Sequence, residues 1–146
     1  MSGQVVAVCV SEKKGEKKKP VSSVFLEEDH GIRGDAHAGP GTRQVSLLSV
    51  ESIEKMRALG LDVGPGDFAE NITVSGVDFS AVTPGAKIRI GETVVVEVTQ
   101  KGKECHDRCA IFYQAGDCVM PREGVFGRVV RGGQVKPGDT VVVEEG

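Results

Sequence analysis

The sequence predicts a mostly β protein, a barrel of short strands with one or two short helices. Glycine contributes 20 of the 146 residues, and short apolar runs recur between turn signals along the chain. Frequent turns favour many short strands over long helices, and such strands pack well as a closed or nearly closed barrel. No linker or change of composition divides the chain, so residues 1–146 are expected to form a single domain.

The strands are expected where β-branched and other apolar residues cluster. These runs are Val5–Val10, Val21–Glu27, Gln44–Leu48, Phe68–Val74, Thr93–Thr99, Val125–Val130 and Thr140–Glu144. Pro84-Gly85 and Pro137-Gly138 each carry the signature of a type II turn that leads into a strand. Alternation along the central run Thr93–Thr99 places Val94, Val96 and Val98 on one face.

One helix is expected over Val50–Leu59. Ser49 can cap its first turn, because a serine side chain accepts a hydrogen bond from a backbone amide that the helix leaves unpaired. Ile53, Met56 and Leu59 recur at a spacing of three residues, which places them on one face. We therefore expect these three residues to form the apolar face of the helix.

The overall charge argues against a nucleic-acid-binding protein. The formal net charge is −3 and the pI is about 5.6, so the chain lacks a broad basic field. Residues 13–19 form a local basic run without aromatic side chains, interpreted as a solvated loop, with an RNA- or phosphate-binding arm as the alternative. The N-terminus carries no signal-peptide pattern and no apolar stretch reaches ~18 residues, so we expect a cytoplasmic protein that does not enter a membrane.

The sequence contains four cysteines, which in the cytoplasm are expected as thiols, metal ligands or nucleophiles. Cys105 and Cys109 follow the strand Thr93–Thr99, and Lys103 beside them would favour the reactive thiolate. Cys105 is thus interpreted as a functional thiol, with an inert thiol as one alternative. A structural zinc site is the other alternative, although its spacing fits paired zinc-binding motifs poorly; its ligands would be Cys105, His106, Cys109 and Cys118. Cys9 lies inside a strand and is expected to be inert.

A second candidate surface is the Gly-rich loop, residues 30–41. Exposed backbone amides and interleaved arginines suit an anionic ligand, so Arg33 and Arg43 are candidate contacts. Asp35 and His37 could take part, or could simply pin the loop by hydrogen bonds. Farther along, Glu70-Asn71 interrupts an apolar run. Its side chains are expected either to satisfy a neighbouring loop or to face the pocket.

The ordered set of motifs resembles the MOSC domain family, named after the C-terminal domain of molybdenum cofactor sulfurases. The motifs are Gly31-Ile32-x-Gly34-Asp35-x-His37, Arg43-Gln44-Val45-Ser46-Leu47-Leu48, Gly66-Asp67-Phe68-x-Glu70-Asn71-Ile72, Gly85-x-x-Ile88-x-Ile90-Gly91, Glu97-Val98-Thr99-Gln100 and Gly124-Val125-Phe126-x-Arg128-Val129. They run through nearly the whole chain, and their order is more specific than any one of them. The likeness is to the stand-alone bacterial type.

The resemblance implies a barrel-based fold that binds the pterin-based molybdenum cofactor, with one cysteine as a metal ligand. Cys105 lies at the offset beyond the strand at which the family places this cysteine, so it is the expected catalytic residue and ligand. Cys109 is the alternative ligand, because many relatives have proline where this chain has Glu104. The expected cofactor contacts are Arg33, Asp35, His37, Arg43, Asn71 and Lys103.

The resemblance also implies two activities. Some members reduce N-hydroxylated compounds, and here the electrons would come from a separate reductase, because the chain has no flavin or nicotinamide motif. The alternative is a non-catalytic carrier that uses a persulfide on Cys105 and hands sulfur or cofactor to a cofactor-biosynthesis partner.

Overall fold

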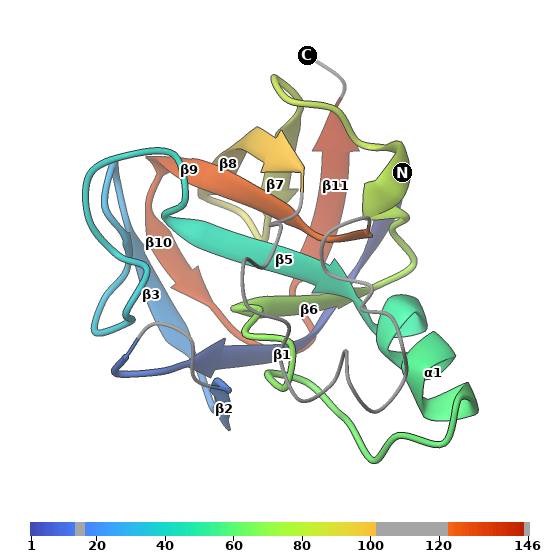
Figure 1. Cartoon of the computed structure of the whole chain (residues 1–146). Coiled ribbons are helices and arrows are strands. Elements are labelled where there is room, and N and C mark those ends of the chain that lie inside the picture. Colours follow the sequence, from blue (N-terminus) through green and yellow to red (C-terminus); the bar gives the residue numbers. More distant parts are fainter. Residues whose placement is uncertain (14–16, 102–122, 145–146) are drawn as a thin grey trace.

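The computed structural model describes residues 1–13, 17–101 and 123–144. Its main feature is a closed barrel of seven strands, which closes where β1 pairs with β11 (Figure 1). In order around the barrel the strands are β11 (Thr140–Glu144), β7 (Lys87–Ile90), β8 (Val94–Lys101), β9 (Val125–Arg131), β5 (Val45–Ser49), β6 (Ile72–Ser75) and β1 (Ser2–Val10). Neighbouring strands are antiparallel except for β5 and β6. The predicted mostly β barrel is confirmed.

A smaller sheet lies beside the barrel and is seen at the left of Figure 1. Its strands are β10 (Gly133–Val135), β3 (Val24–Glu27) and β4 (Gly31–Ile32), while β2 (Lys19–Val21) pairs with β1. The chain passes from β9 into this sheet at Gly132. A Cβ atom at Gly132 would lie 2.4 Å from the carbonyl oxygen of Leu26, so only glycine allows this close crossing.

The barrel interior is filled by alternating side chains, as predicted for the central strand. Val94, Val96 and Val98 of β8 are buried, whereas Val95 and Glu97 on the opposite face are half-buried. Both predicted Pro-Gly turns are also present, because Gly85 and Gly138 have φ angles of 98° and 96°. These positive φ angles are the feature that a type II turn requires.

The helix α1 (Val50–Ala58) follows β5 and begins as predicted, with Ser49 accepting a hydrogen bond from the Ser52 amide at 3.2 Å. Ile53 and Met56 are buried under it, but Leu59 is 63% exposed. The expected third apolar contact was wrong because Leu59 is the C-cap residue and no longer follows the helical face. A short 3₁₀ helix, η1 (Phe79–Ala81), precedes β7.

Beyond small shifts of strand boundaries, such as the start of β1 at Ser2 instead of Val5, two predicted runs differ from the observed strands. The run Val21–Glu27 is divided at two serines, so that β2 joins the barrel and β3 joins the small sheet. The run Phe68–Val74 becomes a strand only at Ile72, because the preceding residues are held in a turn. Its closing contacts include Ala69 N to Gly66 O at 3.0 Å.

Among the described residues, no helix is long and apolar enough to cross a membrane.

Candidate functional site

The Gly-rich loop leads from β4 towards β5 and is held by a buried carboxylate. Asp35 Oδ1 accepts hydrogen bonds from the Ser11 amide at 3.0 Å and from Lys18 Nζ at 2.8 Å. Asp35 Oδ2 accepts the amide of His37 at 3.0 Å. Burial alone would raise the pKa of Asp35, but the hydrogen bonds from Lys18, Ser11 and His37 outweigh it and lower the pKa. Asp35 therefore pins the loop as a charged group.

Lys18 comes from the basic run that was expected to be a solvated loop. Its side chain and that of Asp35 are both 0% exposed, and the two form an ion pair. The Lys18 amide also donates to Gly66 O at 2.8 Å, which ties the run to the turn before β6. The expectation was wrong for Lys18. Its ammonium group pairs with the buried carboxylate of Asp35, which is distant in sequence, instead of with water.

Two predicted residues meet at one aromatic ring. The His37 ring lies edge-on to Phe126, with 6.0 Å between ring centroids and an interplanar angle of 74°. The Arg43 guanidinium lies over the same ring, 5.7 Å from its centroid. Phe126 itself is 3% exposed and packs in an apolar cluster with the α1 residues Ile53 and Met56. The ring is thus a fixed platform for two groups that can carry positive charge.

Contacts with the end of β8 hold Arg43 in this place. Arg43 Nε donates to Gln100 Oε1 at 3.1 Å, and the single proton of the Thr99 hydroxyl lies between the carbonyl oxygens of Thr42 and Phe126, both within hydrogen-bond distance. We call the group formed by His37, Arg43, Gln100 and Phe126 the Arg43 site. The chain continues from it, two residues after Gln100, into the sequence that contains Cys105.

Arg33 is not part of this group. It lies over the ring of Phe25 at 4.7 Å and donates from Nε to Glu27 at 3.2 Å. Both partners belong to β3, and together with Val10 and Val24 the two stacked residues line a shallow cavity of about 320 Å³. The structure therefore brings His37 and Arg43 together and leaves Arg33 on the small sheet.

Asn71 lies in the interior and bridges two barrel strands. Its Oδ1 accepts the Ser46 amide at 3.0 Å, and its Nδ2 donates to Cys9 O at 3.1 Å. The neighbouring Glu70 is also fully buried and accepts hydrogen bonds from the Gly66 amide at 2.9 Å and the Thr73 hydroxyl at 2.7 Å. Of the two expected roles for this pair, satisfying a neighbouring loop is the one that these contacts fit.

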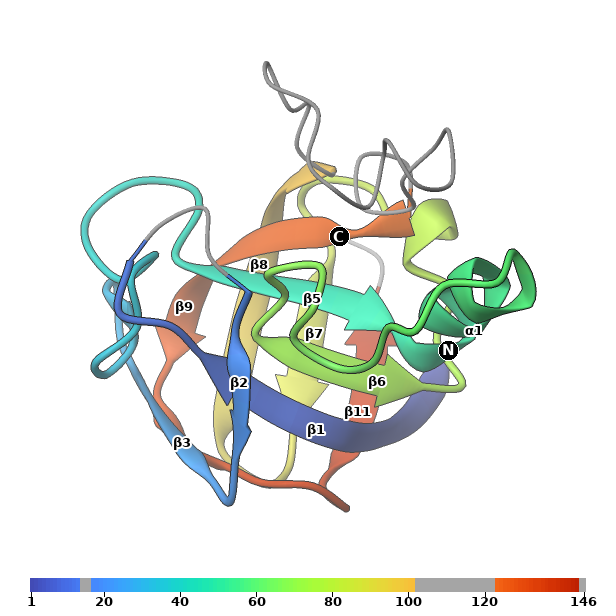
Figure 2. The same ribbon diagram turned by 60° about the horizontal axis from the view of Figure 1, so that its bottom comes forward.

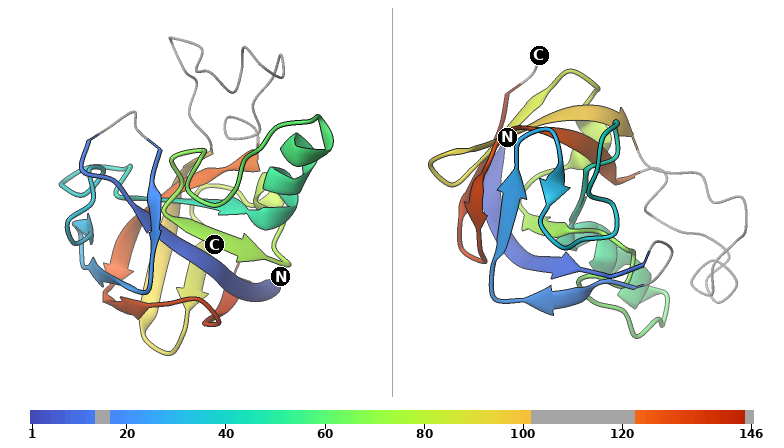
Figure 3. Two further views of the ribbon diagram at one scale, coloured as in Figure 1. Left: turned by 90° about the horizontal axis from the view of Figure 1, so that it is seen from below. Right: turned by 90° about the vertical axis from the view of Figure 1, so that its left-hand side faces the viewer.

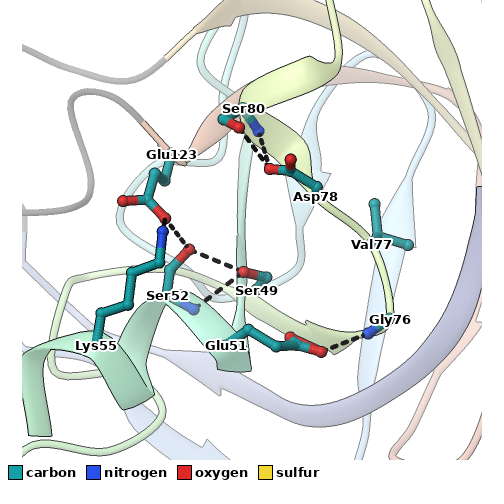
Figure 4. A pocket seen from close by; sticks show the side chains of 9 residues that line it. All are labelled: Ser49, Glu51, Ser52, Lys55, Gly76, Val77, Asp78, Ser80 and Glu123. Atoms are coloured by element: carbon teal, nitrogen blue, oxygen red, sulfur yellow. Dashed lines mark hydrogen bonds and ion pairs between the residues drawn. The ribbon is translucent and has the colours of Figure 1, made fainter. Parts of the chain in front are cut away.

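A polar cavity of about 350 Å³ lies beside the first turn of α1 (Figure 4). Ser52 Oγ and Lys55 Nζ both donate to Glu123 Oε1, at 2.7 and 2.9 Å. Across the cavity, Asp78 accepts from the Ser80 amide at 3.0 Å, and hydrogen bonding from Ser80 lowers the pKa of Asp78. Sequence reasoning did not find this cavity, because its residues come from separate elements and form no motif.

The predicted thiols Cys105 and Cys109, together with Lys103, lie outside the described residues, as do the other ligands of the zinc alternative. Cys9 is described and is buried in β1. Burial, followed by the charges of Glu70 and Asp67, raises the pKa of Cys9 to about 12, so its thiol stays protonated. Within residues 1–13, 17–101 and 123–144, no group of three His, Cys, Asp or Glu side chains is placed to hold a metal ion.

Comparison with known proteins decides the family. The model of the MOSC domain matches residues 33–142, which is most of the chain. The chain belongs to the MOSC domain family. MOSC domains are associated with binding of the molybdenum cofactor. No curated protein sequence matches the chain.

Solved structures share the MOSC-like fold. The YUAD protein from Bacillus subtilis matches with a TM-score of 0.84 and 19% identity, over 100% of this chain and 97% of that chain. YiiM from Geobacillus stearothermophilus matches with a TM-score of 0.69 and 21% identity, over 98% of this chain and 75% of its own. YiiM from Escherichia coli matches with a TM-score of 0.65 and 19% identity, over 98% and 70%. The likeness extends over this whole MOSC domain.

The Arg43 site has the chemistry that the phosphate end of such a cofactor requires. A guanidinium group offers paired N–H donors to phosphate oxygens, and Arg43 is exposed to solvent. Gln100 and Phe126 both contact that group, and such contacts restrict its conformations and lower the entropy cost of binding. The described part of this MOSC domain therefore fits an anionic ligand.

Proposed function

We propose that this MOSC domain binds the molybdenum-pterin cofactor at the Arg43 site. The observation that carries the proposal is the placement of Arg43, which is exposed to solvent and contacts both the Phe126 ring and Gln100. Arg43 would bind the cofactor phosphate. His37, on the edge of the same ring, would extend the polar surface for the pterin. Arg33 would contribute only long-range positive charge, because its guanidinium lies on Phe25.

The metal end of the cofactor would be held by Cys105, with Cys109 as the alternative ligand. Lys103 would favour the thiolate form, which is the form that binds metals. Asp35 and Asn71 would act indirectly, since their side chains are buried and hold the loop and strands around the site. When bound, the cofactor supplies a metal centre that exchanges two electrons.

The activity proposed for the loaded protein is reduction of N-hydroxylated compounds. The N–O bond would break with two electrons from a separate reductase and two protons, leaving the N–H compound and water. The chain itself would bind and orient the cofactor and present the thiol. The carrier function, with a persulfide on Cys105, would use the same residues without turnover.

The experiment is to purify the wild-type chain, Cys105→Ser and Cys109→Ser from a host that makes the cofactor. We expect Cys105→Ser to lose bound molybdenum while its unfolding midpoint stays unchanged, and Cys109→Ser to keep most of it. The reverse pattern would move the ligand to Cys109. Turnover of an N-hydroxylated substrate with an artificial electron donor distinguishes the enzyme from a carrier. Loss of fold and zinc together in both variants would refute cofactor binding through these thiols.

A further inference from the structure

We propose that the buried ion pair of Lys18 and Asp35 is a positioning device for the Arg43 site. In this proposal the pair fixes the Gly-rich loop so that His37 and Arg43 flank Phe126, and thereby sets the affinity of the site for anions. The inference rests on the proposed function for its anion, but the placement of the loop can be tested without the cofactor.

Asp35 accepts hydrogen bonds through both of its carboxylate oxygens. One oxygen accepts from the Ser11 amide and Lys18 Nζ, and the other accepts from the His37 amide. Ser11 directly follows β1, whereas His37 belongs to the Arg43 site. The Asp35 carboxylate therefore links the end of β1 to this site. A side-chain amide has a single acceptor oxygen and could not serve both sets of donors. Replacement of Asp35 by asparagine keeps the size of the side chain but removes one of the two acceptor oxygens, which breaks the link between Ser11 and His37.

Lys18 is held through both its side chain and its backbone. Its ammonium group also donates to the Ser11 hydroxyl at 3.0 Å, and its backbone amide is bonded to Gly66. A Cβ atom at Gly66 would lie 2.1 Å from the carbonyl oxygen of Lys18, so the two backbones are in close contact. Lys18 is therefore a fixed point against which Asp35 is held.

The Lys18–Asp35 pair is linked to the Phe126 ring through the Gly-rich loop. One residue before His37, the Ala36 amide donates to the carbonyl oxygen of Ser11, the residue that follows β1, at 2.8 Å. From there the His37 ring contacts the edge of Phe126, and Arg43 covers the same ring. A shift of Asp35 would move the His37 amide, and with it the loop that leads to Arg43.

Lys18 and Asp35 form an ion pair although both side chains are buried. Burying two charges removes their hydration, and an apolar pair of similar volume often gives equal or better stability. Ion pairs in the interior instead define one arrangement of the groups that they join. A loop that carries many glycines needs such definition more than a barrel strand does, because its backbone has more accessible conformations.

The experiment compares Asp35→Asn with the double variant Lys18→Met/Asp35→Asn, in which no buried charge is left uncompensated. The matched control is Glu144→Gln, which removes the carboxylate of the exposed Arg89–Glu144 pair, 2.9 Å apart. Two readouts are taken on each protein. NMR measures the ring-current shifts that Phe126 imposes on His37 and Arg43 protons, and titration with inorganic phosphate measures anion affinity.

We expect the His37 protons to lose their ring-current shifts in both Asp35 variants. The Arg43 protons should lose part of theirs, because Gln100 also contacts Arg43, and phosphate affinity should fall roughly tenfold. The control should keep wild-type values. A double variant that is folded and retains the wild-type shifts would overturn the proposal and reduce the pair to a stabilising contact. If the wild-type protein binds neither phosphate nor cofactor, the proposed function fails, whereas the shifts still decide whether the pair positions the loop.

Discussion

Two arginines close to the Gly-rich loop each lie over a phenylalanine ring, yet the two pairs are differently supported. Arg33 lies over Phe25, which is 45% exposed on the small sheet. Arg43 lies over Phe126, which is 3% exposed and packed in an apolar cluster. Figure 2 shows the loop passing from the small sheet to β5 of the barrel. A contact between arginine and phenylalanine can therefore lie on the surface or belong to a well-packed site. The packing around the phenylalanine ring makes the difference.

In the left view of Figure 3, the small sheet lies at one side of the barrel. The small sheet has three short strands, whereas each strand of the closed barrel has a bonded neighbour on both edges. Groups held by the barrel should consequently move less than groups held by the small sheet.

The largest effect is expected from Val96→Asp, which would remove the barrel support on which the Arg43 pair depends. Val96 is fully buried and lies opposite Val129 of β9. An unpaired charge there should cost on the order of 3–5 kcal/mol of unfolding free energy, measured by denaturant titration. Val95→Asp, on the half-buried face, is the control and should cost far less. Equal losses would mean that the two faces of β8 are assigned wrongly.

The next effect separates the two rings. Phe126→Ala should destabilise the protein by about 3 kcal/mol, because it leaves a cavity in a packed cluster. Phe25→Ala should cost less than about 1 kcal/mol, since a half-exposed ring is replaced largely by water. Thermal or denaturant unfolding of the two variants measures both losses. A larger loss for Phe25→Ala would invert the comparison and place the rigid site on the small sheet.

The two arginines should differ in ligand binding rather than in stability. Arg43→Ala should lower the molybdenum and pterin retained per chain by roughly tenfold, the effect of losing one charge-assisted phosphate contact. Arg33→Ala should retain wild-type amounts, because its guanidinium lies on another ring. The two variants are purified in parallel from a host that makes the cofactor. Similar retention by both would remove Arg43 from the site.

The smallest effect concerns Cys9, which lies in the barrel wall. Its pKa of about 12 and its burial should prevent alkylation under native conditions. Peptide mass spectrometry should find label on Cys105 or Cys109 first and on Cys9 only after unfolding. Labelling of Cys9 as fast as of Cys105 would contradict a protected position for Cys9 in the barrel wall.

Much of the barrel could be predicted from the sequence because its signals are local. Alternation in Thr93–Thr99, the two Pro-Gly turns and the Ser49 cap each depend on neighbouring residues, and each is found in the structure. The small sheet could not be predicted, since its strands are short and the chain enters it through a close crossing at Gly132. Two of them, β4 and β10, have only two and three residues, which are too few to show a period.

The candidate site was only partly predictable for a related reason. Arg43 and His37 stand out by residue type, but their common partner Phe126 is distant in sequence and looks like any core residue. Lys18 has no distinguishing mark among the lysines around it, although it alone of the described ones is buried. Its partner Asp35 lies 17 residues away, and only the fold brings the two charges together.

The most direct test of the account is to measure molybdenum and pterin on one sample of wild-type protein purified from a host that makes the cofactor. The account predicts that both are present in equal amounts, elute with the protein, and are lost together on denaturation. Zinc without pterin, or protein free of both metals and pterin after purification from such a host, would contradict it.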